Sequence, residues 1–364
     1  MIGRFRLIVE ARLDRPGRVE IALRLAGGTL LALAAGAIII AASGADPLVA
    51  LTALLRGGFG TKAAFFGTLN KAVPIGLCAL GIALAARARL INIGAEGQFF
   101  FGAFAATGIG LHLPADTPHV LAVGLILAGG FVAGAIWASL AAIPRALLGM
   151  SEVLSTLMLN YICLLWIGYL VRGPWSDPAT FSFPYSPPIL AAGQLRALDR
   201  AWFGPLHGGF FLLLAATLAL VLIDRGTRWG YELRVSGDAP RAALYGGIRA
   251  AFIIVSGLCA AGALAGMAGA VEVAASTGRL QLGLSPGYGF MGIMVAWLAG
   301  GRPFAILLVS IAYAGLLNGG FSLQVSRIPA SISTILQALI LLFALGAATL
   351  AAYRIRLVRT VRTA

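Results

Sequence analysis

Long apolar segments separated by short polar ones constrain this chain more than any other feature. Hydrophobic residues make up 60% of its 364 residues, and charged residues only 11%, against roughly 25% in a soluble domain. About 20 apolar residues are needed for a helix to cross the hydrocarbon core. The sequence therefore predicts an all-α polytopic membrane protein with about ten transmembrane helices, of which the third and eighth are short. The predicted spans are 21–42, 67–86, 91–111, 120–143, 153–171, 207–223, 250–271, 287–300, 304–318 and 329–352.

The arginines and lysines indicate which segments face the cytoplasm. If both ends lie on one side, nineteen of the 27 basic residues fall on that side, and cytoplasmic segments carry such an excess. We therefore expect a basic cytoplasmic arm (1–24), a transmembrane domain (25–352) and a basic cytoplasmic tail (353–364). The charged break 224–249 would be cytoplasmic, and the Pro- and Trp-rich loop 172–206 external. The net charge of +14 follows from this rule, so the expected contact is membrane lipid and not nucleic acid.

A short internal similarity suggests how the spans are arranged. The segment GLCALG at 76–81 recurs as GLCAAG at 257–262, in spans predicted to run in opposite directions. Inverted repeats of this kind are a recurrent plan of transporters. Gly- and Ala-rich sequence also produces such matches by chance, so both interpretations stay open.

The chain lacks the residues that ATP hydrolysis requires. A phosphate-binding loop needs a lysine directly after a glycine, and neither Lys62 nor Lys71, the two lysines, has that neighbour. Ser285 lies in a G-x-S-x-G pattern typical of hydrolases, but that pattern needs a strand–turn–helix context and a histidine partner. The simpler interpretation is a turn that begins a helix. The three cysteines lie in apolar runs without ligand spacing, so no catalytic residue, metal or cofactor is expected.

Polar side chains inside or beside the apolar segments are candidates for a translocation path, because charge in lipid is costly and usually faces a cavity or a partner. For Glu152 the alternative is a first-turn acid favoured by the helix dipole. An ion-coupled secondary transporter could use Glu96 or Glu272, although no paired proton relay is evident. The path candidates are Asn92, Glu96, Gln98, Glu152, Asn160, Asn318 and Gln337.

Several of these residues lie in motifs that resemble a known family. The segment INIGAEGQ at 91–98 resembles the most typical motif of bacterial ABC importer permeases of the simple-sugar and nucleoside branch, which is related to the branched-chain amino acid and ribose-type permeases. SEVLSTLMLNYI at 151–162 resembles a second motif, and 287–293 and 336–340 resemble two weaker ones. The resemblance implies a type II ABC importer-like fold in the bacterial inner membrane, serving as a permease subunit without an ATPase site of its own.

The charged break also resembles the coupling loop of that family, although an ordinary solvated loop is the alternative. In such permeases a short helix there sits in a cleft of the ATPase subunit. The matching residues are Arg234, Gly237, Asp238, Pro240, Ala242, Ala243 and Gly246. The resemblance further implies an ATP-binding cassette subunit, a second and different permease, an extracytoplasmic substrate-binding protein, and a nucleoside or simple sugar as substrate.

Overall fold

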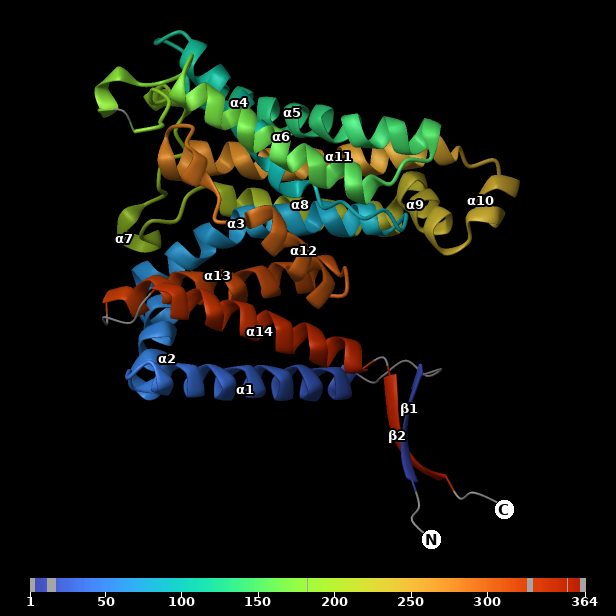
Figure 1. The fold of residues 1–364 in the computed structure, drawn as a ribbon. Coiled ribbons are helices and arrows are strands. Elements are labelled where there is room, and N and C mark those ends of the chain that lie inside the picture. Colours follow the sequence, from blue (N-terminus) through green and yellow to red (C-terminus); the bar gives the residue numbers. More distant parts are fainter. Residues whose placement is uncertain (1–3, 12–17, 182, 326–329, 352, 361–364) are drawn as a thin grey trace. The chain divides into compact units, whose positions relative to one another are not determined.

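The computed structural model describes residues 4–11, 18–181, 183–325, 330–351 and 353–360. The chain divides into two compact units, residues 58–318 and residues 1–57 with 319–364. The described residues form helices and turns apart from two short strands in the terminal segments (Figure 1).

Long apolar helices form the frame of residues 58–318. Helix α3 continues through Pro74, and α5 ends at Gly149 in the left-handed conformation (φ 68°), which glycine adopts without a Cβ penalty. These helices are α3 (Lys62–Ala86), α4 (Ala95–His112), α5 (His119–Leu148), α6 (Glu152–Arg172), α8 (Gly209–Gly226), α11 (Ala250–Glu272), the short α12 (Tyr288–Leu298) and α13 (Pro303–Val325), which extends past residue 318.

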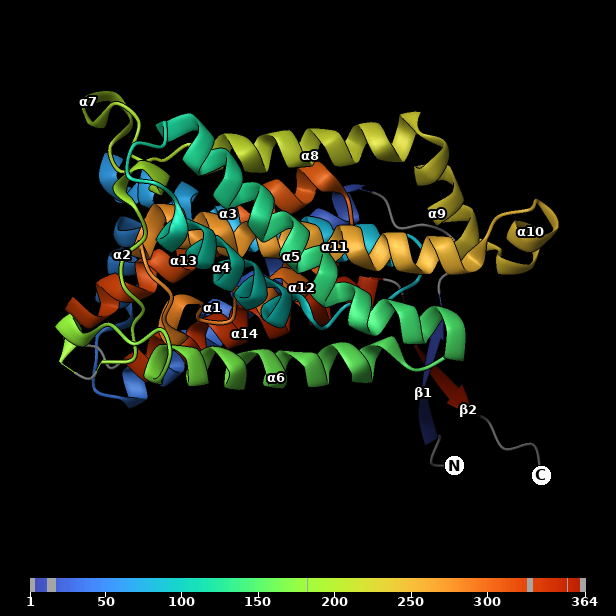
Figure 2. The same ribbon diagram turned by 90° about the horizontal axis from the view of Figure 1, so that it is seen from above.

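Short elements connect the long helices at their two ends. The connection before α8 contains η2 (Pro178–Thr180), η3 (Ala191–Gly193) and α7 (Arg200–Phe203), and the connection after α8 contains α9 (Arg228–Asp238) and α10 (Pro240–Tyr245). The π turn η4 (Val273–Thr277) continues α11, and η5 (Leu282–Leu284) precedes α12. Figure 2 shows α7 and α10 at opposite ends of the helices in this unit.

Helix α11 forms the centre of this unit because its glycines allow backbones to approach. A Cβ at Gly266 would meet the carbonyl oxygen of Gly130 in α5, and one at Gly269 would meet that of Phe99 in α4. On another face, a Cβ at Gly81 of α3 would lie 2.6 Å from the carbonyl oxygen of Ala261. Such contacts replace the hydrophobic effect, which gives helices in lipid little reason to associate.

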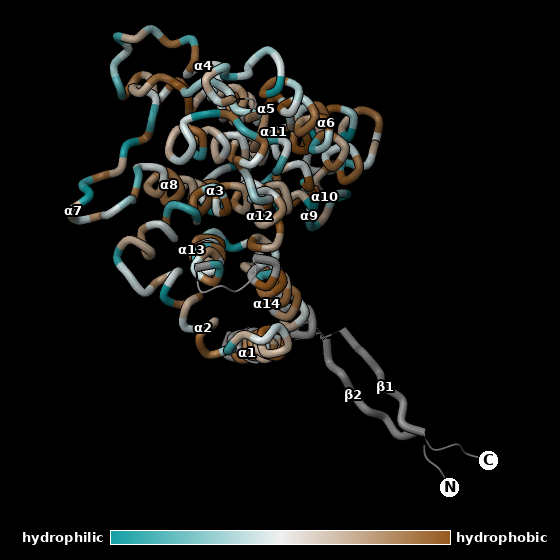
Figure 3. The backbone as a smooth tube through the Cα atoms, turned by 60° about the vertical axis from the view of Figure 1, so that its left-hand side comes forward, coloured by the Kyte–Doolittle hydropathy of each residue, from teal (hydrophilic) through white to brown (hydrophobic). Residues whose placement is uncertain are grey.

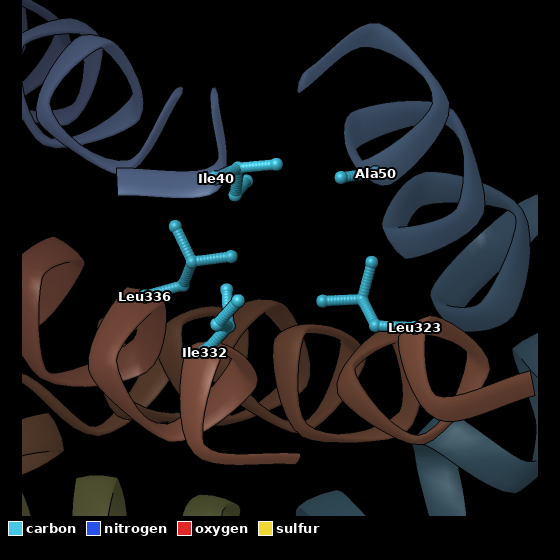
Figure 4. Close-up of a cluster of buried hydrophobic side chains, with 5 residues drawn as sticks. All are labelled: Ile40, Ala50, Leu323, Ile332 and Leu336. Carbon is cyan, nitrogen blue, oxygen red and sulfur yellow. The ribbon is translucent and has the colours of Figure 1, made fainter. Parts of the chain in front are cut away.

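Residues 1–57 with 319–364 contain α1 (Arg18–Ala42), α2 (Pro47–Leu55), the end of α13 and α14 (Ala330–Ala351); the π turn η1 (Arg56–Gly60) follows α2. Asp46 caps α2 by accepting a hydrogen bond from the Leu48 amide at 2.8 Å. The unit is held by a cluster of buried side chains, one or two from each helix (Figure 4): Ile40, Ala50, Leu323, Ile332 and Leu336.

The terminal segments are the exception to the predicted all-α fold. Strand β1 (Arg4–Ala11) pairs antiparallel with β2 (Tyr353–Thr360), and Arg4 lies opposite Thr360. Both segments alternate apolar and polar residues with many β-branched side chains, a pattern that favours strands. The predicted basic arm and tail are therefore joined through their backbones.

Each of the ten predicted apolar segments contains a helix, and 43–61, expected to be a polar connection, contains α2. By length and composition, six helices in the described part of the chain could cross a membrane. In Figure 3 the segment around α7 is hydrophilic, as expected for a connection outside the hydrocarbon core. The polytopic membrane fold is therefore confirmed, whereas ten crossings and inverted repeats stay predictions.

Candidate functional site

The segment that leads into α4 is held together by its own side chains. The Asn92 side-chain amide donates to Gln98 Oε1 at 2.8 Å, and Gln98 Nε2 donates back to Asn92 Oδ1 at 3.2 Å. Asn92 Oδ1 also accepts from the Gly94 amide at 3.0 Å. Both side chains are buried, so their hydrogen bonds offset the cost of removing them from water.

Helix α6 binds the same segment through Asn160. Its Oδ1 accepts from the Gly97 amide at 2.8 Å, and its Nδ2 donates to the Ile93 carbonyl at 2.9 Å. A Cβ on Gly97 would lie 2.9 Å from Asn160 Oδ1, which explains a glycine there. We call Asn92, Gly97, Gln98 and Asn160 the polar knot. It brings together three predicted path residues, all satisfied by hydrogen bonds.

Glu96, next to the polar knot, contacts another helix. Its Oε2 accepts from the Gly289 amide at 2.7 Å in the first turn of α12, and its side chain is 3% exposed. A Cβ on Gly289 would collide with the Glu96 amide nitrogen, so the backbones of the two helix starts touch. A carboxylate at a helix N-terminus satisfies amides that have no partner within the helix, so Glu96 caps α12 from α4.

Ser285 also caps α12, and this confirms the simpler interpretation of its motif. Its Oγ accepts from the amides of Gly287 at 3.0 Å and Tyr288 at 2.8 Å. The hydroxyl is therefore engaged in starting a helix.

Sequence reasoning missed the polar group beside α12 that involves Lys71. Lys71 Nζ in α3 donates to Tyr288 Oη at 3.4 Å. Glu272, buried at the end of α11, interacts electrostatically with Lys71 and with Tyr288, and its side chain is hydrogen-bonded to Ser276. The available signal was a lysine inside an apolar helix, which is rare in membrane proteins and usually has a partner.

The other path candidates are not members of the polar knot. Glu152 is in the first turn of α6, forms an ion pair with Arg145 Nε at 3.1 Å, and accepts from the Ile91 amide beside Asn92 at 3.5 Å. Asn318 Nδ2 donates to the Ala64 carbonyl at 3.2 Å and to Thr68 Oγ1 at 3.3 Å, joining α13 to α3. Gln337 lies in α14, within the other unit.

Some residues of the predicted coupling loop attach the loop to the ends of the membrane helices. Asp224 at the end of α8 binds Arg87 Nη2 at 2.7 Å, and the Asp224 carbonyl accepts a hydrogen bond from Arg234. Arg87 also donates to the Gly301 carbonyl at 2.8 Å. A Cβ on Gly237 would meet the carbonyl oxygen of Arg87. Arg234 therefore fixes α9 to the end of α8, and Gly237 packs α9 against the end of α3. Their predicted role in coupling stays a prediction.

The rest of the predicted coupling loop is exposed, with one exception. Asp238, Pro240, Ala242 and Gly246 are exposed, whereas Ala243 is buried. Sequence reasoning did not single out the large apolar side chains of α10, Leu244 and Tyr245, which are 64% and 95% exposed. Two such side chains in a charged segment were the signal that could have found them.

The apolar helices, the buried polar contacts between them and the projecting α10 define a class, that of multi-pass membrane transport subunits. A family model described as "Branched-chain amino acid transport system / permease component" matches residues 64–345. The chain belongs to this family of permeases.

Relatives over most of the chain's length support the sugar and nucleoside branch. The glucose ABC transporter permease protein TsgB13 of Haloferax volcanii is 32% identical over 361 residues, covering 95% of this chain and 94% of the relative. The guanosine permease NupP of Bacillus subtilis is 32% identical, covering 86% and 90%, and the nucleoside permease NupB of Lactococcus lactis 30%, covering 85% and 86%. No solved structure matches the chain. The protein is thus an ABC importer permease, and the ion-coupled alternative is not favoured.

Proposed function

We propose that this permease carries nucleosides or simple sugars, driven by ATP that a separate ATP-binding cassette subunit hydrolyses. The observation that carries the proposal is the match over residues 64–345, together with relatives named for glucose, guanosine and nucleosides. These substrates are uncharged and rich in hydroxyl groups, so one polar path could serve either class.

The exposed face of α10 is the proposed docking surface for the ATPase subunit. Leu244 and Tyr245 would fill an apolar cleft, as buried aromatic anchors do at stable interfaces. Arg241 beside them is exposed and available to acidic groups of the partner. Because Arg87, Asp224 and Arg234 join α9 to the ends of α3 and α8, a push on α10 would reach these two helices.

The remaining features of the transporter are inferred from the family and from the arginine distribution. We infer about ten crossings with inverted repeats, both termini in the cytoplasm and the loop 172–206 outside the inner membrane. A second, different permease and an extracytoplasmic binding protein would complete the importer. We assign Asn92, Gln98 and Asn160 to holding α4 in place, and keep Asn318 and Gln337 as path candidates.

Co-purification tests the proposed coupling. Tyr245→Asp should abolish recovery of the ATPase subunit with the permease in mild detergent, and should abolish uptake of guanosine or glucose. Phe181→Asp is the matched control, because Phe181 is a 92% exposed aromatic in the loop 172–206, and it should leave both unchanged. Equal recovery of the ATPase subunit with both variants would remove α10 from the interface.

A further inference from the structure

A polar cavity of about 950 Å³ is lined in part by Arg200 of α7. Figure 2 shows α7 at the end of the helices opposite α10. The walls of the cavity come from the start of α3, from the connection before α8 and from η4 at the end of α11. The volume is within the range of about 300–1,000 Å³ typical of small-molecule sites. The lining residues that can hydrogen-bond through side chains are Asn70, Gln194, Arg196, Arg200, His207, Ser276 and Thr277.

Backbone hydrogen bonds hold the walls of this cavity in place. The Leu195 amide donates to the Ala274 carbonyl and the Ile189 amide to the Gly278 carbonyl, both at 2.8 Å. Asn70 Nδ2 donates to the Pro205 carbonyl at 2.7 Å, and Asn70 Oδ1 accepts from the His207 amide at 3.1 Å. The connection before α8 is therefore fixed to α3 and to η4, so hydrogen bonds hold the walls of the cavity in place.

One wall is a π turn, which is rare and often found at functional sites. Within it, Ser276 is exposed toward the cavity and hydrogen-bonded to the buried Glu272. Asn70, on the facing wall, directly precedes Lys71 in α3. The buried Glu272 is thus one hydrogen bond away from the cavity, and the half-buried Lys71 is one residue away from it.

The enclosed groups of the cavity are uncharged. His207 Nδ1 accepts from the Gly209 amide at 3.2 Å, so the neutral ring carries its proton on Nε2 and can donate. Burial lowers the pKa of His207 to about 4, which keeps the ring neutral near pH 7. The two cationic residues, Arg196 and Arg200, are exposed and therefore screened by water and salt.

We propose that this cavity is the outer binding site for an uncharged, hydroxyl-rich ligand of nucleoside or sugar size. Asn70, His207, Ser276 and Thr277 would offer hydrogen bonds to its hydroxyl groups. The ligand would reach the Ser276–Glu272 contact before passing between the helices. This inference rests on the proposed function, and places the first contact of the substrate with the permease.

Filling the cavity tests the inference in the assembled transporter, with its ATPase subunit and binding protein in proteoliposomes. Ser276→Trp should lower uptake of radiolabelled guanosine or glucose at least tenfold. Ala179→Trp is the matched control, because Ala179 is exposed in the loop 172–206 and does not line the cavity, and it should transport normally. Wild-type uptake by Ser276→Trp would overturn the inference and leave the proposed function intact.

Chemical protection gives a second readout in case Ser276→Trp does not assemble. Ser276→Cys should react with a charged methanethiosulfonate reagent, and guanosine or glucose should slow this reaction at least threefold. Guanosine monophosphate should protect less, because the enclosed groups carry no positive charge. Protection by the phosphorylated compound alone would overturn the choice of an uncharged ligand. Failure of the unaltered transporter to take up either compound would overturn the proposed function together with this inference.

Discussion

The polar knot and α10 use opposite principles at two places in one bundle. In the polar knot, Asn92, Gln98 and Asn160 are buried, and every one of them bonds to a group within the chain. On α10, Leu244 and Tyr245 are apolar and exposed. A buried and satisfied polar cluster fixes a backbone, whereas an exposed apolar pair favours a partner. The comparison teaches that the motif most typical of the family is engaged in packing the bundle, while the less distinctive helix leaves exposed the apolar side chains on which the proposed interface rests.

The largest expected effect comes from breaking the cap beside the polar knot. Glu96→Ala removes the acceptor of the Gly289 amide and leaves that group unpaired in a buried site, which should lower the free energy of unfolding by about 3 kcal/mol. Unfolding in detergent, followed by circular dichroism, would measure it. Glu96→Gln keeps an acceptor and should lose less than half as much. An unfolding midpoint equal to that of the unaltered protein would show that the cap is dispensable.

The next prediction distinguishes the residues of the coupling loop that pack against the membrane helices from those proposed to bind the ATPase subunit. Gly237→Ala places a methyl group against the Arg87 carbonyl and should cost about 2 kcal/mol of stability, as overpacking does. Ala242→Arg lies on the exposed surface and should leave stability unchanged, while weakening binding of the ATPase subunit. Unfolding midpoints and pull-down yields, measured on both variants, would distinguish the roles. If Ala242→Arg lowered stability and Gly237→Ala weakened only the binding of the ATPase subunit, the two roles would be reversed.

A smaller loss of stability is expected at Asp224, which connects the buried helix bundle to the exposed coupling loop. Asp224→Asn keeps the shape of the side chain but weakens its pairing with Arg87 and Arg234, at a cost of about 1.5 kcal/mol. The ATPase subunit should still bind, because α10 is unaltered. More ATP should be hydrolysed per molecule transported, since α9 is held less firmly. A normal ratio of ATP to substrate would remove the transmission role from this contact.

The smallest effect concerns pH. Because burial lowers the pKa of His207 to about 4, below the value of roughly 6.5 in an unfolded chain, protonation favours the unfolded state. Stability should be complete above about pH 7 and should decrease by about 1 kcal/mol at pH 6 through linkage. His207→Asn should flatten the stability curve between pH 8 and pH 6. A curve of unchanged slope would contradict the assignment.

Local patterns predicted the helices well and the contacts between them poorly. Each apolar segment of the sequence contains a helix, because burial in lipid requires about 20 residues of one character. The sequence could place Asn92 and Asn160 in family motifs, but the bonds of Asn160 to Gly97 and Ile93 join residues 63 and 67 positions apart and depend on the packing of α4 on α6. The Lys71–Tyr288 contact is more distant still. Helix α2 was missed because glycines and a proline surround a short apolar run.

The exposure of α10 was also beyond local reasoning. Ala242 and Ala243 look equivalent in the sequence, yet one is exposed and the other buried, because consecutive residues of a helix point in directions about 100° apart. Arg234 looked like a charge available to a partner, but its guanidinium bonds to Asp224. A sequence gives the charge and size of each side chain. Which face of a short helix is exposed depends instead on how the rest of the chain packs against it.

The glycine contacts of α11 have a consequence for how this gene can change. Gly102, Gly134, Gly266 and Gly269 lie where a Cβ would meet backbone atoms of a facing helix. Every missense change of a glycine codon adds a side chain, so no single-base change that alters one of these residues could be accommodated without separating two helices. Exposed apolar positions such as Leu125 or Ile136 should exchange among apolar residues more freely. Sequence drift in this permease should therefore be slowest along a stripe of glycines whose contacts are with the backbones of neighbouring helices of the same chain.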